Sequence, residues 1–211
     1  MFHRLIFRLI GLLALSCAAF AQQFTADMVH SKPQSDVVTK VYVSEDKMRL
    51  ETTSQEHSGV AIVNLEQRTS LMLVPASKTY VASRAPSATP FFRPADADNA
   101  CEAWEKFVSK PGTCTKVGEE TVNGRSTVKY KGTAPNGDTG FAWVDRQLKF
   151  VTKWEGEKTA VEFQNIKEGP QEASLFAVPS DYEKIDVPQP HKGKPKTAKP
   201  RVVLPPQTPK P

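Results

Sequence analysis

The second half of the chain alternates between apolar and polar residues, with glycine-containing turns between the alternating segments. The dipeptide Asn123-Gly124 separates two of these segments. Asn-Gly is the strongest short-range signal of a β-hairpin, because a type I′ turn needs two residues that accept positive φ. Phe141 and Trp143 share one face of a later segment. Residues 116–166 therefore predict five antiparallel strands with one apolar face and one polar face.

The first half of the chain has the same strand-like pattern. Segments rich in β-branched and apolar residues predict six further strands, at residues 24–30, 36–44, 47–53, 60–65, 70–74 and 79–82. The segments 60–65 and 70–74 are apolar at consecutive positions, so we expect both faces of the sheet to be covered there. The predicted fold class is mainly β, with about eleven antiparallel strands.

An irregular stretch at residues 83–100 interrupts this rhythm with three prolines and the pair Phe91-Phe92. Stretches of this length inside a compact domain are uncommon and are often functional or mobile. Phe91 and Phe92 either fill a gap in the core or form a flap over an apolar cavity. Residues 99–109 then predict a single helix, because Asn99 can cap it and Trp104 belongs to an apolar stripe.

The first 21 residues have the features of a secretory signal peptide. Arg4 and Arg8 supply a basic start, residues 9–14 form an apolar run too short to span a membrane, and Ala19-Phe20-Ala21 is an A-x-A cleavage site. We expect export to the periplasm or the medium, with cleavage after Ala21. A mature protein that begins at Gln22 in mass spectra would support this expectation.

Lipid attachment at Cys17 is a rival outcome of processing. We do not favour it, because the preceding Ala14-Leu15-Ser16 departs from the usual order of a lipobox. Removal of the leader leaves only Cys101 and Cys114, and an isolated pair in an exported protein is most simply a disulfide. The C-x-x-C spacing of many redox-active pairs is absent. The entropic model assigns such a bond about 3 kcal/mol of stabilisation.

The basic charge of the chain resides in its C-terminal tail, residues 187–211. This segment holds six basic residues, eight prolines and no acidic residue. Without the tail and the two leader arginines, the formal net charge of +5 becomes −3 for the domain at residues 22–186. This composition is typical of disordered segments. The tail is either a solubilising extension or a contact to an anionic membrane or cell-wall surface.

Signatures of catalysis are absent from the sequence. The histidines outside the leader, His30, His57 and His191, are far apart and in no metal-ligand spacing. No nucleophile elbow, phosphate-binding loop or dinucleotide fingerprint occurs. The basic residues of the domain do not cluster with aromatic residues as a nucleic-acid surface requires. We therefore expect no enzyme activity, no cofactor, no metal and no nucleic-acid partner.

Four short motifs carry a resemblance to a known family. They are Pro75-Ala76-Ser77-Lys78-Thr79-Tyr80, Glu120-Thr121-Val122-Asn123-Gly124, Ala142-Trp143-Val144-Asp145, and the closing pattern S-L-F-x-V-P-x-x-Y from Ser174 to Tyr182. In order and spacing they resemble the DUF4412 family, exported bacterial proteins of the LolA/LolB-like superfamily. The resemblance covers residues 24–185.

This resemblance implies an incomplete, strongly curved antiparallel β-barrel, closed on its concave side by the helix and a loop. In the better-known relatives the concavity holds acyl chains of lipoproteins or other lipids. The chain departs from those carriers in two respects. It has no lid helix before the strand at Phe24, and residues 44–49 lack the Arg-Pro step that those carriers place after the second strand.

These observations predict an exported, monomeric, non-enzymatic protein that binds a lipid or another long apolar ligand in envelope lipid or lipoprotein handling. The alternative is an envelope interaction or scaffold module with a solidly packed barrel, whose concavity is filled by the helix and the Phe91-Phe92 pair. Strand alternation gives the candidate ligand-binding residues on inward faces: Met28, Val41, Met48, Leu50, Ile62, Leu71, Leu73, Phe91, Phe92, Phe141, Trp143 and Phe163.

Overall fold

The computed structural model describes residues 22–32, 37–53, 58–84, 92–106, 112–134 and 137–186. The predictions for the leader and the tail concern residues outside these ranges. The described strands are β1 (Gln23–Lys32), β2 (Thr39–Ser44), β3 (Lys47–Thr53), β4 (Ser58–Asn64), β5 (Thr69–Val74), β6 (Thr79–Arg84), β7 (Thr113–Val122), β8 (Arg125–Thr133), β9 (Thr139–Asp145), β10 (Phe150–Gly156), β11 (Ala160–Glu168) and β12 (Glu183–Lys184). The described helical elements are α1 (Ala100–Glu105) and the 3-10 turn η2 (Ala173–Phe176).

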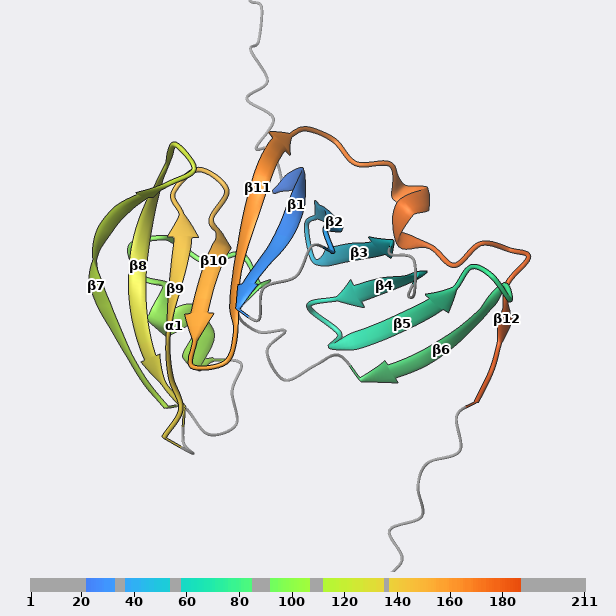
Figure 1. Ribbon diagram of the computed structural model, residues 1–211, viewed down its shortest axis with the longest axis horizontal. Helices are drawn as coiled ribbons and strands as arrows, with labels where there is room; N and C mark the ends of the chain where they lie inside the picture. Colours follow the sequence, from blue (N-terminus) through green and yellow to red (C-terminus); the bar gives the residue numbers. More distant parts are fainter. Residues whose placement is uncertain are drawn as a thin grey trace, which may run out of the picture.

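All twelve strands belong to one open sheet, in the order β12-β6-β5-β4-β3-β2-β1-β11-β10-β9-β8-β7. Neighbouring strands are antiparallel except for β12, which runs parallel to β6. Figure 1 shows β7–β11 nearly upright and β3–β6 nearly horizontal, so the sheet is strongly curved. The predicted mainly β, incompletely closed sheet with one short helix is confirmed, and it has twelve strands where about eleven were expected.

The N-terminal strand β1 lies in the middle of the sheet, between β2 and β11. The chain proceeds outward from β1 to β6, crosses to the opposite edge at β7, and returns to the centre at β11. The crossing segment includes α1, which lies beside β7–β10 in Figure 1. Sequence order therefore divides the sheet into two halves that meet at β1 and β11.

The largest core cluster lies at the junction of the two halves, on the face that we call the inner face. It includes the fully buried Phe24, Val41, Phe150 and Phe163. The rings of Phe24 and Phe150 meet edge to face with centroids 5.3 Å apart, a favourable aromatic geometry. Trp154 packs against this cluster and also against the cluster beneath α1, so one apolar layer extends across the sheet from β4 to β8.

Helix α1 lies over the inner face of the second half of the sheet. Trp104 packs edge to face on Tyr130, with ring centroids 5.4 Å apart. The side chain of Asn99 does not cap the helix as expected. Its amide donates to the Glu102 carboxylate instead. Cys101 and Cys114 form the predicted disulfide, which joins α1 to β7 with Cα atoms 5.6 Å apart. Residues 107–109 of the predicted helix lie outside the described ranges.

The Asn-Gly hairpin has the conformation that the sequence indicates. Asn123 and Gly124 have φ angles of 50° and 75°, the positive values that a type I′ turn requires. The turn joins β7 to β8, and the register runs from Val122 opposite Arg125 to Thr113 opposite Thr133. A bulge between Lys116 and Gly118 interrupts this ladder.

Candidate functional site

The candidate site is a row of apolar side chains across the inner face of β2–β6. Val41 lies opposite Leu50, Leu50 opposite Ala61, Ala61 opposite Met72, and Met72 opposite Val81. We call this set the inner row. Because neighbouring strands are about 4.8 Å apart, five strands make the row about 19 Å long.

The inner row passes from the core to the surface. Val41 is fully buried, Leu50 and Ala61 are half-buried, and Met72 is 48% exposed. Val74, two positions after Met72 on the same face of β5, is 42% exposed. Isolated exposed apolar residues are common, but these two adjoin an apolar row that continues into the core. The outer end of the inner row is therefore an apolar surface on a formed β-sheet.

Polar groups flank the inner row along the strands. On one side Thr39 and Thr52 lie opposite each other, and their hydroxyl oxygens are 2.8 Å apart. On the other side Ser70 is buried, between Val63 and Ser83. The most exposed apolar side chains of this face, Met72 and Val74, therefore both lie on β5, and the half-buried part of the inner row extends from them across β4 and β3.

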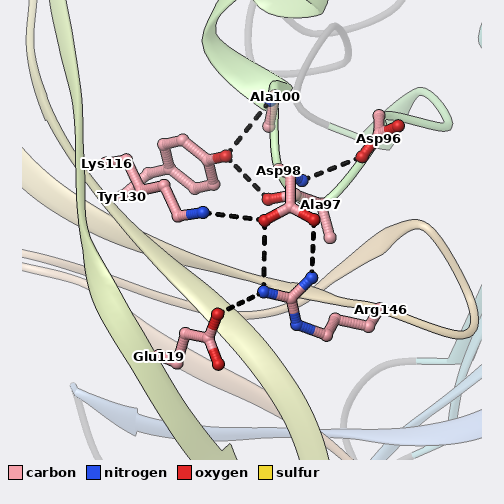
Figure 2. A network of polar contacts seen from close by, with 8 residues as sticks. All are labelled: Asp96, Ala97, Asp98, Ala100, Lys116, Glu119, Tyr130 and Arg146. Carbon is pink, nitrogen blue, oxygen red and sulfur yellow. Dashed lines mark hydrogen bonds and ion pairs between the residues drawn. The ribbon is translucent and has the colours of Figure 1, made fainter.

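The inner face beneath α1 is covered, unlike the outer end of the inner row. Figure 2 shows the polar contacts that hold the segment before α1 in place. The Tyr130 hydroxyl donates to the Ala97 carbonyl at 2.7 Å and accepts from the Ala100 amide at 3.3 Å. Because Tyr130 is buried in β8, these bonds attach the start of α1 directly to the sheet.

Asp98 is the centre of the charged part of this network. Its carboxylate accepts bonds from Arg146 at 2.7 and 3.1 Å and from Lys116 at 2.7 Å, and Arg146 also pairs with Glu119. Hydrogen bonds from Arg146 and then Lys116 hold the pKa of Asp98 well below its usual range. The Asp98 amide donates to Asp96 at 2.9 Å. These groups satisfy one another, so the network positions α1.

A second ion-pair cluster lies at the turn between β9 and β10. Arg125 donates to the buried carboxylate of Asp145 and to Glu168, the latter at 2.8 Å. Asp145 also accepts from the amides of Gln147 and Leu148. Asp145 therefore orders the turn and ties β8 to β9. In the described part of the chain, no group of three or more His, Cys, Asp or Glu residues could hold a metal ion.

Phe141 and Trp143 lie on the opposite, outer face of the sheet, which corrects the expectation of a shared inward face. Trp143 is buried because the ammonium groups of Lys129 and Lys153 lie 4.7 and 4.6 Å from its ring centroid. Its indole nitrogen donates to Glu120 at 2.7 Å. The bond from Lys129 and then that from Trp143 lower the pKa of Glu120. Long lysine side chains thus cover this aromatic surface.

Ile62, Leu71 and Leu73 also lie on the outer face, so the prediction of their inward placement is wrong. They form a cluster with Val60 that packs against Phe176 and Tyr182 of the C-terminal segment. This segment, residues 170–186, is here called the C-terminal strap. In Figure 1 it passes from the end of β11, through η2, to β12 at the edge of β6.

The predicted ligand-binding residues therefore separate into two groups. The structure brings six of them together on the inner face: Met28, Val41, Met48, Leu50, Phe92 and Phe163. Phe91 lies outside the described residues. The sequence interpretation missed Met72 and Val81. Residues 70–74 are apolar on both faces, so their pattern does not indicate which face turns inward.

Comparisons with solved structures identify the fold. An uncharacterised conserved protein from Thermus thermophilus matches with a TM-score of 0.52 and 11% identity, over 78% of this chain and 90% of that one. At this identity the likeness concerns the fold alone. No protein-family model matches the sequence, and no curated protein matches it. Membership of the DUF4412 family therefore stays a prediction.

Two further similar structures have lower scores. MucB of Pseudomonas aeruginosa matches with a TM-score of 0.49 and 14% identity, over 77% of this chain and 59% of MucB. A domain from Vibrio parahaemolyticus described as an outer-membrane lipoprotein-sorting protein matches at 0.35 and 12% identity, over 72% and 88%. The chain also spans 31% of PNGF-II. Within the described ranges, no helix is long and apolar enough to cross a membrane.

Proposed function

We propose that this protein is a non-catalytic carrier or sensor of a long apolar ligand, a lipid acyl chain, which lies along the inner row. The observation that supports the proposal is the exposure of Met72 and Val74 on the same face as the buried Val41. Fully burying one large apolar side chain contributes about 1.5–3 kcal/mol, so covering this surface is favourable.

The dimensions of the inner row suit one acyl chain. The inner row is about 19 Å long across five strands, and an acyl chain would follow it from the exposed Met72 toward the half-buried Ala61 and Leu50, short of the fully buried Val41. The flanking Thr39–Thr52 pair and Ser70 limit the apolar width to one or two side chains per strand. Met72 and Met28 are flexible and polarizable, which suits contact with a changeable chain. A single chain across the strands therefore fits better than a broad apolar surface.

Export is part of the proposal and rests on the signal-peptide pattern of residues 1–21. A carrier in the cell envelope would meet acyl chains of lipids or lipoproteins there. The polar residues near α1 are engaged with one another, as Figure 2 illustrates for Asp98 and Arg146, which supports binding without catalysis.

The experiment is a titration of the purified mature protein with a fluorescent fatty acid. We expect saturable binding by the wild type and at least about tenfold weaker binding by Met72→Glu. The new carboxylate would have to give up its hydration when the acyl chain binds beside it. The control is Val117→Glu, which places the same charge at an exposed apolar residue of the edge strand β7. It should bind like the wild type.

Absence of saturable binding by the wild type would contradict the proposal and leave the interaction module as the better hypothesis. Equal weakening by Met72→Glu and Val117→Glu would show that the effect is one of net charge, and the inner row would not be the site. Mass spectrometry of the native protein gives a second measurement, since a resident ligand should co-purify as an added lipid mass.

A further inference from the structure

The C-terminal strap is the segment that covers the outer face of β3–β6. It contacts the sheet through two aromatic side chains, Phe176 and Tyr182, which pack against the cluster of Val60, Ile62 and Leu73. Both aromatic side chains are only half-buried, whereas the three sheet residues beneath are buried. The three sheet residues are therefore buried more completely than the strap side chains that cover them.

Backbone bonds attach the end of the strap to the edge of the sheet. The amides of Glu183 and Ile185 donate to the carbonyls of Lys78 and Tyr80, each at 2.9 Å. These two bonds make β12 a two-residue parallel strand. A strand of this length supplies little stability by itself.

Polar side chains supply the other contacts of the strap, one of which is the bond from the Gln171 amide to the Gln23 side chain at 2.8 Å. Arg49 donates to the Leu175 carbonyl at 2.7 Å. Its side chain is mostly buried and also pairs with Glu51. Lys78 pairs with Asp181, but both side chains are more than half exposed, and exposed pairs contribute little. No residue of η2 is buried, and both residues of β12 are exposed.

The sheet supplies every feature of the docking surface. The buried apolar cluster belongs to β4 and β5, and the guanidinium belongs to β3. The carbonyls belong to Lys78, just before β6, and to Tyr80 in β6. Strands β3, β4, β5 and β6 are joined by continuous antiparallel ladders. An exposed strand edge beside apolar pockets is a recurrent mode of recognition of extended peptides.

We propose that this surface is a peptide-docking site, which the strap occupies in cis and an extended segment of another polypeptide occupies in trans. The partner segment carries two aromatic side chains six positions apart, as Phe176 and Tyr182 are, and presents backbone amides to the edge of β6. The strap therefore acts as a competitor that a stronger segment displaces. This inference is independent of the proposed acyl-chain site, which lies on the other face.

The test uses the full-length protein and a fluorescently labelled synthetic peptide of residues 170–186. The tethered strap competes at an effective concentration on the order of millimolar, so wild-type protein should bind the peptide weakly. In the protein variant Phe176→Ser/Tyr182→Ser, the site is free more of the time. Because apparent affinity scales with the free fraction, we expect at least about tenfold tighter binding of the peptide, by fluorescence anisotropy.

Two matched controls define the result. A peptide with the same two serine substitutions should bind neither protein, and the protein variant Val117→Ser should bind the native peptide as weakly as the wild type does. Failure of the native peptide to bind the folded Phe176→Ser/Tyr182→Ser protein would overturn the proposal. Circular dichroism of the same variant shows whether it is folded and is expected to give the β-sheet spectrum of the wild type.

Amide hydrogen exchange of the wild type gives a second test that needs no variant. If the strap detaches while the sheet stays folded, the amides of Glu183 and Ile185 exchange at least about tenfold faster than those of Ile62 and Leu73. Exchange of all four amides at one common rate would mean that the strap leaves only when the domain unfolds. That result would also overturn the proposal.

Discussion

Met72 and Leu73 are adjacent in β5 but lie on opposite faces of the sheet, with 48% and 2% of their surfaces exposed. Met72 belongs to the inner row, between Ala61 and Val81. Leu73 lies on the outer face, in the cluster that the C-terminal strap covers. One strand therefore contributes to two separate apolar surfaces, of which the structure covers one.

This difference predicts unequal effects of truncating the two side chains. Leu73→Ala should lower the free energy of unfolding by about 2–4 kcal/mol, because it leaves a cavity between the sheet and the strap. Met72→Ala should lower it by less than about 1 kcal/mol, because the side chain is half in water. Urea denaturation of both variants measures the difference. Equal losses would mean that the inner row is packed as tightly as the outer cluster.

Arg125 should be essential to stability through the buried carboxylate of Asp145. Arg125→Leu removes the ion-pair partner of the buried Asp145 carboxylate. We expect the free energy of unfolding to fall by on the order of 3 kcal/mol, because a buried charge is left without its counter-charge. Lys106→Leu is the control, since the side chains of Lys106 and of its partner Glu102 are both more than half exposed. It should lower the free energy of unfolding by less than about 1 kcal/mol. Similar losses in the two variants would contradict the assignment.

The ion pairs of Asp98 predict a specific dependence of stability on pH. The folded state lowers the pKa of Asp98 from its ordinary value of 3.8, chiefly through hydrogen bonds from Arg146 and Lys116. A lowered pKa in the folded state stabilises the protein above the ordinary pKa, and this contribution is lost as the pH falls through 3.8 toward the folded value. Asp98→Asn should therefore lower the thermal midpoint at pH 7.

The difference between Asp98→Asn and the wild type should shrink below about pH 4 and in high salt, because the carboxylate is exposed to screening. Thermal unfolding from acid to neutral pH measures this difference. The exposed Glu157→Gln is the matched control and should follow the wild type at every pH. A constant gap between Asp98→Asn and the wild type would mean that protonation of Asp98 does not govern the effect.

The Cys101–Cys114 disulfide should stabilise the attachment of α1. The two cysteines are 13 positions apart, and the entropic model for a loop of this size gives about 3 kcal/mol. The Cys101→Ala/Cys114→Ala variant should lose stability of this order in urea. It should keep the fold, because Tyr130 attaches the segment before α1 independently. Detection of two free thiols in the denatured, unreduced exported protein would contradict the bond.

The sequence by itself determined β1–β11 and one of the turns, but not β12. A period of two in apolar residues indicates a strand wherever it occurs, because successive side chains in extended backbone point to opposite faces. Asn123-Gly124 indicated its hairpin because only a few residue types accept positive φ. The isolated pair of cysteines predicted the disulfide, since pairing needs only two thiols and an oxidising compartment.

Only the tertiary structure decided which face of each strand turns inward. A shift of register by one residue exchanges the two faces, and the segments at β4 and β5 are apolar on both. The elements that cover each face determine which side chains are buried there. The strap, from the end of the chain, covers Leu71 and Leu73, whereas α1 covers the inner face of the other half. Met72 lies in the inner row because its neighbours in sequence pack beneath a segment about a hundred residues away.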